Sequence, residues 1–509
     1  MTPLDIPPHL VALKRYADLT DLASLCEYSD RPLRKSLRVN LLKTSVEAMK
    51  EHAKKLDWTL TPVPWCAEAF FVDRPSLPRG ELRPASRENH GEEDRPVYGP
   101  AIGRDLLHVL GHFYLQEAAS MLPPSLLDAQ PGERILDMSA APGSKTTQLA
   151  SRMQGRGLIL ANDVQEQRLW TLKSALHRLG VHNVLVTKKV GQWFSKHMTE
   201  RFNRVLCDAP CTAEGTVRKD SDSLRYCSAE NREKMARLQY QLLEAAIHTT
   251  VTHGRIVYST CTLTPEENEG VVSQILERFA GQVEIVDPRT LPSVAGWDMT
   301  KAIEDSLRVQ EHLKSVGPWP LALGTFPALR LWPQTYDTEG FFSAVLRKVA
   351  PTREVEPLDR VHFEERELPR SRVREVAAQM EKRFGASFLE EDDRLFERGE
   401  QLLLANSDVA CFTLPVSDYS LGLPFGKRLT DGRVLMHHEF ATLRGGRATD
   451  NVVEISDTEL PELLAGKDLT CDPALHGQVM LKHAGIPIGH SLAKEGRLKN
   501  NIPRWVIQA

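Results

Sequence analysis

Two cysteines lie where an α/β enzyme would place reactive groups. Cys211 follows the apolar run RVLCDAP, and Cys261 ends the run RIVYSTC; both runs predict strands. Because parallel sheets bind ligands at the carboxyl ends of their strands, we expect the two thiols to meet in one cleft, with Asp208 beside them. A lone cysteine is more often a small buried hydrophobe. Two cysteines with a carboxylate favour nucleophilic chemistry.

Methylation of cytosine at carbon-5 is a reaction that uses this set of groups. Carbon-5 is too weak a nucleophile to accept a methyl group until a thiolate adds to carbon-6 and pushes electron density across the ring. A second thiol would help to remove the carbon-5 proton and to release the product. A carboxylate such as Asp208 would accept a hydrogen bond from the exocyclic amine, which disfavours uracil. The spacing alone does not say which cysteine attacks.

A small-residue turn joins a predicted strand to a predicted helix in residues 134–146, RILDMSAAPGSKT. Gly143 would let a ligand approach backbone N–H groups, and Lys145 would pair with its carboxylate. Asp163 ends the next apolar run, GLILAND, where an acidic residue typically binds ribose hydroxyls. A turn without a ligand and a helix cap at Asp163 are the plainer alternatives. Together the features favour a nucleoside ligand, either a dinucleotide or S-adenosylmethionine.

Strand-like runs alternate with amphipathic stretches over residues 98–349, which predicts a doubly wound, Rossmann-like α/β domain. Residues 1–97 predict an N-terminal α/β RNA-binding module that ends in the polar stretch RPASRENHGEEDRP, a loop or linker. The charge-dense residues 350–405 predict solvated helices that connect two domains. Residues 406–509 predict a third unit with strands at VACFTLPV, VLMHHEFATL and QVMLKHAG.

The composition of the 509 residues limits the class of protein. No apolar stretch is long enough for a membrane span, and the start of the chain has no secretion signal, so a cytoplasmic enzyme is expected. The cysteines form no CxxC pair, so no metal site is predicted, and no feature demands more than a monomer. A net charge of −4 means that local patches must bind any nucleic acid. Residues 476–509 set one acid, Glu495, against five basic residues: Lys482, Lys494, Arg497, Lys499 and Arg504.

The motifs resemble those of the Nol/Nop/Sun family of RNA (cytosine-5) methyltransferases. ILDMSAAPGSKT is similar to the family's S-adenosylmethionine loop, DAPCTAEGTVRKD to its Pro-Cys motif, and YSTCTLTPEENEGVV to its Thr-Cys motif. Shorter matches at LRVNLLK, YLQEAASMLP and RLWPQTYDTEGFFSAVLRK extend the resemblance over residues 1 to about 349. The resemblance implies that Cys261 is the nucleophile and that Cys211 promotes product release. It also implies a set of S-adenosylmethionine-binding residues: Ser139, Ala140, Ala141, Pro142, Gly143, Ser144, Lys145, Asp163 and Asp208.

The C-terminal unit resembles a PUA-like RNA-binding module in LGLPFGKRLTDGRVLMHHEFATLRGG and PIGHSLAKEGRLKNNIPRWVI. A long chain with this module resembles the family members that methylate 16S ribosomal RNA, and transfer RNA is the close alternative substrate. A non-catalytic ribosome-assembly factor would not need paired thiols. A nicotinamide-dependent oxidoreductase would need a GxGxxG turn, which the first strand lacks. A basic N-terminal cluster would add phosphate contacts or form an ordinary solvated face: Arg31, Arg34, Lys35 and Arg38.

Two positions depart from the family pattern. Val190 stands where an acidic residue usually contacts the adenine, so backbone amides or Gln192 are expected to substitute for it. Ser221 and Cys227 replace a proline and a tryptophan after the Arg-Lys-Asp run, which changes the shape expected for that substrate loop. Neither departure affects the two cysteines.

Overall fold

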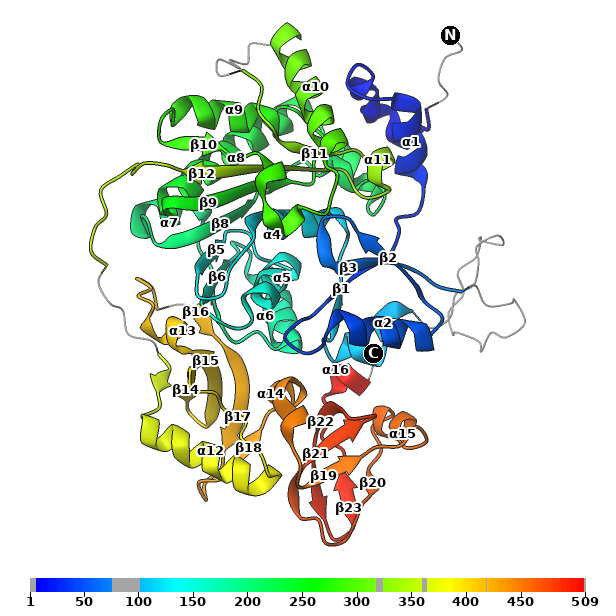
Figure 1. Ribbon diagram of the computed structural model, residues 1–509, viewed down its shortest axis with the longest axis vertical. Coiled ribbons are helices and arrows are strands. Elements are labelled where there is room, and N and C mark those ends of the chain that lie inside the picture. Colours follow the sequence, from blue (N-terminus) through cyan, green and yellow to red (C-terminus); the bar gives the residue numbers. More distant parts are fainter. Residues whose placement is uncertain (1–5, 76–100, 317–323, 359–363, 418, 508–509) are drawn as a thin grey trace.

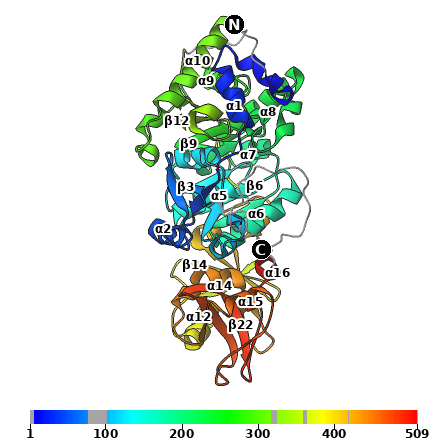
Figure 2. The same ribbon diagram turned by 90° about the vertical axis from the view of Figure 1, so that its right-hand side faces the viewer.

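The computed structural model describes residues 6–75, 101–316, 324–358, 364–417 and 419–507. A large central sheet and a smaller N-terminal sheet lie side by side in one half of the elongated molecule, and two further sheets form the other half (Figures 1 and 2). The predicted linker at residues 83–96 falls outside the described residues. Within the described ranges, no helix has both the length and the apolar character needed to cross a bilayer.

The central sheet follows the order β10-β12-β9-β8-β5-β6-β7-β16, with β11 paired to β12. The adjacent strands β7, β6, β5, β8 and β9 run parallel to one another, whereas β12 is antiparallel to β9. The expected doubly wound, Rossmann-like domain is confirmed. The strands of this sheet are β5 (Arg134–Asp137), β6 (Leu158–Asn162), β7 (Val184–Thr187), β8 (Phe202–Asp208), β9 (Thr250–Thr260), β10 (Val283–Ile285), β11 (Leu329–Leu331), β12 (Phe341–Lys348) and β16 (Tyr419–Leu421).

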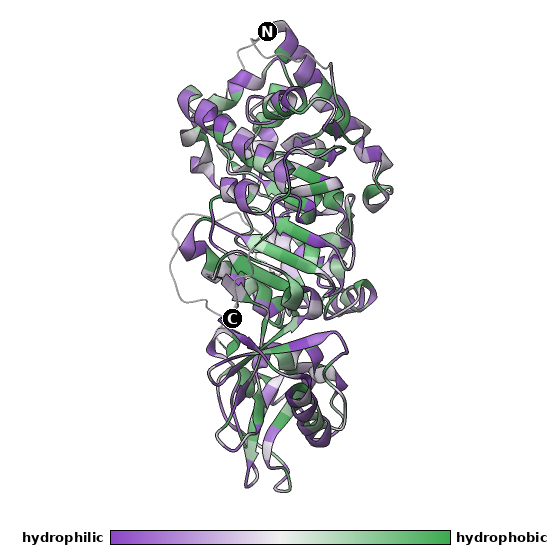
Figure 3. Ribbon diagram, turned by 90° about the vertical axis from the view of Figure 1, so that its left-hand side faces the viewer, coloured by the Kyte–Doolittle hydropathy of each residue, from purple (hydrophilic) through white to green (hydrophobic). Residues whose placement is uncertain are grey.

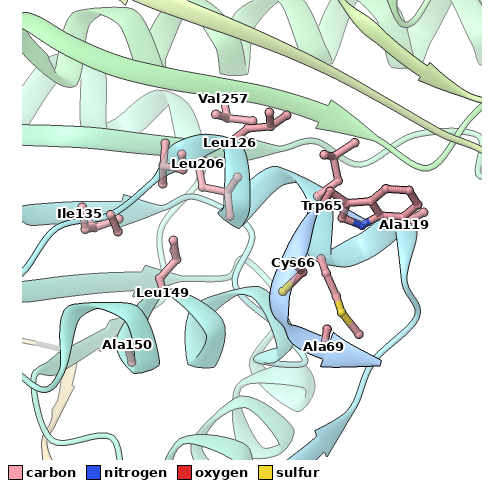
Figure 4. Close-up of a cluster of buried hydrophobic side chains, with 14 of the residues drawn as sticks. Trp65, Cys66, Ala69, Ala119, Leu126, Ile135, Leu149, Ala150, Leu206 and Val257 are labelled. Carbon is pink, nitrogen blue, oxygen red and sulfur yellow. The ribbon is translucent and has the colours of Figure 1, made fainter. Parts of the chain in front are cut away.

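Helices cover both faces of the central sheet because alternate strand side chains point to opposite faces. On one face, Ile135, Leu206 and Val257 pack with Leu149 of α5 (Figure 4). On the other, their neighbours along the strands pack with α7, α8 and α9. The central parts of these strands are consequently mostly apolar (Figure 3). The helices are α4 (Leu122–Leu127), α5 (Ser144–Met153), α6 (Glu166–Leu179), α7 (Gly191–His197), α8 (Ala229–Thr249), α9 (Glu269–Arg278), α10 (Thr300–Val316) and α11 (Pro333–Tyr336).

The N-terminal module is an antiparallel sheet of order β2-β3-β1-β4. Its last strand, β4, lies beyond residue 97, so the module extends past the predicted boundary. Arg38 of β1 is fully buried and donates to Gln116 Oε1 at 2.9 Å and to Thr147 Oγ1 of α5 at 2.8 Å. Arg38 therefore fastens the module to the central domain, and its predicted phosphate contact is wrong. The elements are η1 (Pro8–Tyr16), α1 (Leu22–Asp30), β1 (Ser36–Val39), α2 (Val46–Lys55), β2 (Thr59–Val63), β3 (Cys66–Asp73), α3 (Leu106–Val109) and β4 (Phe113–Leu115).

The C-terminal half contains two five-stranded sheets. The first has the order β13-β14-β15-β17-β18, and β16, from the same stretch of chain, joins the edge of the central sheet at β7. The second has the order β19-β21-β22-β23-β20. The strands are β13 (Arg366–Glu367), β14 (Asp393–Arg398), β15 (Gln401–Asn406), β17 (Leu423–Arg428), β18 (Val434–Met436), β19 (Val452–Glu454), β20 (Leu469–Thr470), β21 (Gly477–His483), β22 (Ile486–Lys494) and β23 (Arg497–Lys499). The helices are α12 (Arg370–Phe384), α13 (Ser407–Cys411), α14 (His438–Arg444), α15 (Leu460–Leu464) and α16 (Arg504–Ile507).

Several predictions about this half are wrong. Residues 350–405 do include the largely exposed helix α12, but they also contain β14 and most of β15, which are strands of a folded sheet in which Leu395 and Phe396 are buried. The run VACFTLPV begins in α13, whose first turn is capped by Asn406 Oδ1 accepting from Val409 N at 2.9 Å. The run VLMHHEFATL is a short strand followed by α14. Short apolar runs do not by themselves distinguish a strand from a buried helix.

Candidate active site

The two predicted thiols meet at the carboxyl ends of β8 and β9. These strands are parallel neighbours, with Asp208 opposite Ser259. Cys211 lies three residues beyond β8, Cys261 directly follows β9, and their sulfur atoms are 3.4 Å apart. The hydrogen bond to Cys261, together with burial, raises the pKa of Cys211 well above its ordinary value. Cys211 therefore keeps its proton at neutral pH, and either thiol can be the donor in the hydrogen bond between the two sulfur atoms.

Glu267 holds the Cys211 loop, a role that the sequence did not reveal. Its buried carboxyl group accepts from Thr212 N at 3.0 Å, Thr212 Oγ1 at 2.5 Å, Thr264 Oγ1 at 2.8 Å and Gln239 Nε2 at 2.7 Å. The Thr212 hydroxyl also lies 2.8 Å from that of Thr262, so the residues that follow the two cysteines are joined directly. Glu267 is within the quoted Thr-Cys motif, but its main partner is 55 positions away in the chain.

Gly215 allows the two cysteine loops to approach β12. Its backbone N–H donates to the carbonyl oxygen of Cys261 at 3.0 Å, and its own carbonyl accepts from Gly340 N at 2.9 Å. A Cβ atom at position 215 would lie 2.2 Å from the Gly340 oxygen and 2.7 Å from the Cys261 oxygen. Since real Cβ atoms do not approach backbone this closely, only glycine fits here.

Asp208 and Lys145 form an ion pair beside the thiols. The Lys145 Nζ lies 2.7 Å from Asp208 Oδ2, and the Ser259 hydroxyl donates to Asp208 Oδ1 at 2.7 Å. Burial is the largest single influence on the pKa of Lys145 and lowers it, but Asp208, Cys261 and Asp137 together raise it by more, so Lys145 stays charged. Burial raises the pKa of the neighbouring Asp137 to about 7. Both oxygens of the Asp208 carboxyl group are thus already engaged by donors.

The turn from residue 139 to residue 145 has the features needed to bind the amino-acid end of S-adenosylmethionine. Gly143 has a φ of +107° and precedes α5, whose N-terminus is not capped by any side chain. A Cβ at this position would lie 3.1 Å from Ala175 Cβ and 3.2 Å from Leu172 Cδ1, so glycine also permits close packing against α6. The backbone N–H groups at the start of α5 remain available for a carboxylate.

Asp163 lies at the carboxyl end of β6, beside the turn. Its Oδ2 accepts from Ala141 N at 3.3 Å and pairs with Arg168 Nη1 at 3.3 Å, while its Oδ1 accepts from Gln165 N at 2.9 Å. Asp163 is only 2% exposed. A ribose that binds to this carboxylate must therefore either displace the half-exposed Arg168 side chain or bind to Asp163 alongside it.

The two departures from the family pattern lie on either side of the cleft. Val190 is 56% exposed at the start of α7, and Gln192 donates instead to Gln241 at 3.0 Å. Cys227 approaches the buried Glu214, and burial is the main cause that raises the pKa of this thiol. Within the described ranges, no group of three histidine, cysteine, aspartate or glutamate side chains could hold a metal ion.

Only some of the basic residues near the C-terminus have side chains that are free of contacts with nearby acidic or carbonyl groups among the described residues. Arg497 pairs with Asp468, and Lys482 donates to the carbonyl oxygens of Gly446 at 3.0 Å and Ala448 at 2.8 Å. The exposed basic residues that are not used in this way are Lys494, which has only the distant Glu495 at 3.7 Å, Lys499 and Arg504. In the N-terminal cluster, Arg31 pairs with Glu27 and Arg34 with Asp73.

Three family models match the chain in order. The N-terminal domain of 16S rRNA methyltransferase RsmF matches residues 12–118, 16S rRNA methyltransferase RsmB/F matches residues 124–347, and the methyltransferase RsmF PUA domain matches residues 450–508.

Curated relatives and solved structures agree with these matches. The chain is 34% identical to ribosomal RNA small subunit methyltransferase F of Escherichia coli O1:K1 / APEC, across 96% of this chain and 92% of the relative. It is 30% identical to the protein of the same name from Shewanella sp. (strain W3-18-1), across 99% and 94%. The structure of a methyltransferase homolog protein from Pyrococcus horikoshii is 31% identical, with a TM-score of 0.50 over 68% of this chain and all of that one. That of NSun6 from Pyrococcus horikoshii with SFG is 23% identical, with a TM-score of 0.51 over 68% and 99%, and shares the fold. The chain belongs to the RsmF family of methyltransferases.

Proposed function

We propose that the chain methylates carbon-5 of a cytosine in 16S ribosomal RNA through a covalent adduct between Cys261 and carbon-6 of the base. As in other methyltransferases of this family, S-adenosylmethionine is the methyl donor. The observation that carries the proposal is the 3.4 Å approach of the Cys211 and Cys261 sulfur atoms beside the Asp208–Lys145 pair. Paired thiols in a cleft are the groups that carbon-5 chemistry requires.

Each group has a distinct task in this reaction. Cys261, as thiolate, adds to carbon-6 and makes carbon-5 nucleophilic. Cys211 keeps its proton, so it can stabilise the Cys261 sulfur by hydrogen bonding when the carbon–sulfur bond breaks at the end of the reaction. The Asp208 carboxylate, fixed by Lys145 and Ser259, is an acceptor for the exocyclic amine of cytosine. The same position would face the carbonyl of uracil and repel it.

The flanking modules are proposed to hold the RNA. A base within structured RNA must leave its stack before a thiol can reach carbon-6, at a cost on the order of a few kcal/mol. Phosphate contacts outside the cleft offset this cost. Lys494, Lys499 and Arg504 are exposed basic side chains that could make such contacts in a chain whose net charge is −4.

The test is transfer of labelled methyl from S-adenosylmethionine to purified 16S ribosomal RNA and to transfer RNA. We expect label in 16S RNA as 5-methylcytosine, and no label with Cys261→Ala. Cys211→Ala should accumulate a slowly migrating protein–RNA adduct on denaturing gels, because the carbon–sulfur bond forms but does not break efficiently.

Cys411→Ala is the matched control, because this cysteine is exposed at the end of helix α13 and is not among the residues of the cleft. It should behave as the unsubstituted protein. Label in transfer RNA alone would show that transfer RNA, and not 16S ribosomal RNA, is the substrate. Label in neither RNA, with RNA binding intact, would favour a non-catalytic assembly factor and refute the proposal.

A further inference from the structure

Two acidic residues close to the cysteine loops, Glu117 and Glu339, have no task in the mechanism above. Glu117 follows β4, and Glu339 precedes β12. The backbone N–H of Glu339 donates to Glu117 Oε1 at 3.1 Å, and Ser120 N donates to Glu117 Oε2 at 3.1 Å. Glu339 is 5% exposed, and its Oε1 has no hydrogen-bond partner among the described residues. An unsatisfied buried carboxyl oxygen is costly and calls for an explanation.

Glu339 is connected to the catalytic centre through its own strand. The next residue, Gly340, donates to Gly215, which in turn donates to the carbonyl oxygen of Cys261. The residue after that, Phe341, has its ring centroid 5.6 Å from the Lys145 Nζ. Lys145 is also close enough to Glu339 to act on its ionisation. The Glu339 side chain therefore starts from the wall of the cleft that faces the nucleophile and the Asp208–Lys145 pair.

The surroundings of Glu339 favour its uncharged form. Burial is the largest cause and the neighbouring Glu117 carboxyl is the second, and together they raise the pKa of Glu339 to about 8. Three cations act in the opposite direction: Lys219, Lys145 and Arg218. Glu117 accepts from backbone N–H groups, which suits an ionised carboxylate. Burial also raises the pKa of Glu117. Two buried carboxyl groups this close do not readily both ionise, and the backbone donors on Glu117 favour keeping the proton on Glu339.

We propose that Glu339 is the acid that protonates N3 of the target cytosine while Cys261 adds to carbon-6. This inference rests on the proposed function. As the sulfur–carbon-6 bond forms, the carbon-5–carbon-6 π pair moves to the carbon-4–carbon-5 bond, and the carbon-4–N3 π pair moves to N3, which takes the proton from the Glu339 carboxyl. The product of the step is a neutral enamine with a nucleophilic carbon-5, and Glu339 is left as a carboxylate. After methyl transfer, the carbon-5 proton leaves to water, which restores the carbon-4–carbon-5 double bond. As the sulfur–carbon-6 bond then breaks, its electron pair stays on the Cys261 sulfur, the carbon-4–carbon-5 π pair moves to carbon-5–carbon-6, the N3–H pair re-forms the carbon-4–N3 π bond, and the N3 proton returns to the Glu339 carboxylate.

The division of work with Asp208 follows from the hydrogen-bonding pattern of cytosine. Its pairing edge presents a donor, the exocyclic amine, next to an acceptor, N3. Asp208 is held as an acceptor by Lys145, so it matches the amine and not N3. An uncharged carboxylic acid supplies the missing donor. A pair of carboxyl groups in different protonation states fits both positions.

The experiment measures kcat and KM for methyl transfer to 16S ribosomal RNA between pH 6 and 9 in two variants. Glu339→Gln retains a hydrogen-bond donor but cannot release a proton, so kcat should fall by about 100-fold at nearly unchanged KM. Activity that requires the acid form should decline as pH rises through about 8 in the unsubstituted protein, and this decline should be absent in the variant. Glu117→Gln removes a negative charge, so the decline should move to lower pH.

Glu365→Gln is the control for replacement of a buried carboxyl group outside the central domain, directly before β13, and should leave the profile unchanged. Thermal melting checks that each variant is folded. Unchanged kcat and pH profile in Glu339→Gln, or a raised KM with the high-pH decline retained, would overturn the inference. An unsubstituted protein that does not methylate RNA would instead refute the proposed function.

Discussion

Replacement of Glu267 tests how the Cys211 loop is held. Of its four donors, Thr212 N and Gln239 Nε2 can only donate, whereas the Thr212 and Thr264 hydroxyls can turn and accept. Glu267→Gln can therefore keep one oxygen for the two N–H groups and donate its amide to the hydroxyls, at a cost of about 1 kcal/mol. Glu267→Ala leaves two buried N–H groups without an acceptor, at about 1–3 kcal/mol each, or about 2–6 kcal/mol in total.

Hydrogen exchange of the Thr212 amide measures this local stability directly, which suits a chain whose several modules need not unfold together. A loss of about 3 kcal/mol corresponds to exchange roughly 100-fold faster in Glu267→Ala, against less than about 10-fold in Glu267→Gln. The alanine variant should also accumulate the protein–RNA adduct, because Cys211 is next to Thr212 and loses its fixed position. Equal exchange rates in the two variants would show that the N–H groups do not depend on this carboxyl group.

Gly215→Ala should abolish most methyl transfer while leaving RNA affinity unchanged in a filter-binding assay, because its Cβ would displace the Cys261 backbone. Arg330→Met should lower the melting temperature, because it leaves Glu269 as a buried carboxylate without its cation, at a cost of about 3–5 kcal/mol in the free energy of unfolding. Arg330→Met/Glu269→Leu should recover most of that loss. Removing three exposed charges should weaken RNA binding and reduce the slope of log affinity against log salt by about 2, whereas Arg497→Gln should change it less because Asp468 already pairs with that residue; the three are Lys494, Lys499 and Arg504.

The central sheet was predictable because its strands carry their own signal. RILDM and GLILAND are continuous apolar runs, as expected of parallel strands that are covered on both faces. The sheet formed by β13, β14, β15, β17 and β18 was not predictable in the same way. Leu395 packs in one hydrophobic cluster and its neighbour Phe396 in another, so both faces of this sheet are covered there. The charged residues of α12 and of the segments around the strands dominate the composition of residues 350–405 and conceal these apolar positions.

Some residues of the candidate site were likewise predictable from the sequence and others were not. The sequence placed Cys211, Cys261 and Asp208 at strand ends, because a strand followed by a polar turn has a known direction in a parallel sheet. Glu267 and Glu339 lie in the same motifs but received no role, since the groups that define them come from distant parts of the chain. A carboxyl group becomes a loop anchor or an acid only when tertiary structure supplies its neighbours.

The N-terminal segment also contacts the loops that carry the two cysteines. Tyr16, at the end of η1, donates a short hydrogen bond to Glu214, three residues beyond Cys211, and Arg15 pairs with Glu266 at 2.6 Å. The Tyr16 ring also meets Trp332 edge-on, with centroids 5.6 Å apart. Both cysteine motifs are therefore held from outside by residues about 200 and 250 positions earlier in the chain. Since these contacts are buried and polar, losing them would leave unsatisfied groups next to the catalytic loop. The Rossmann-like domain contains the two cysteines proposed to react, but the geometry of their loops depends on the N-terminal segment as well.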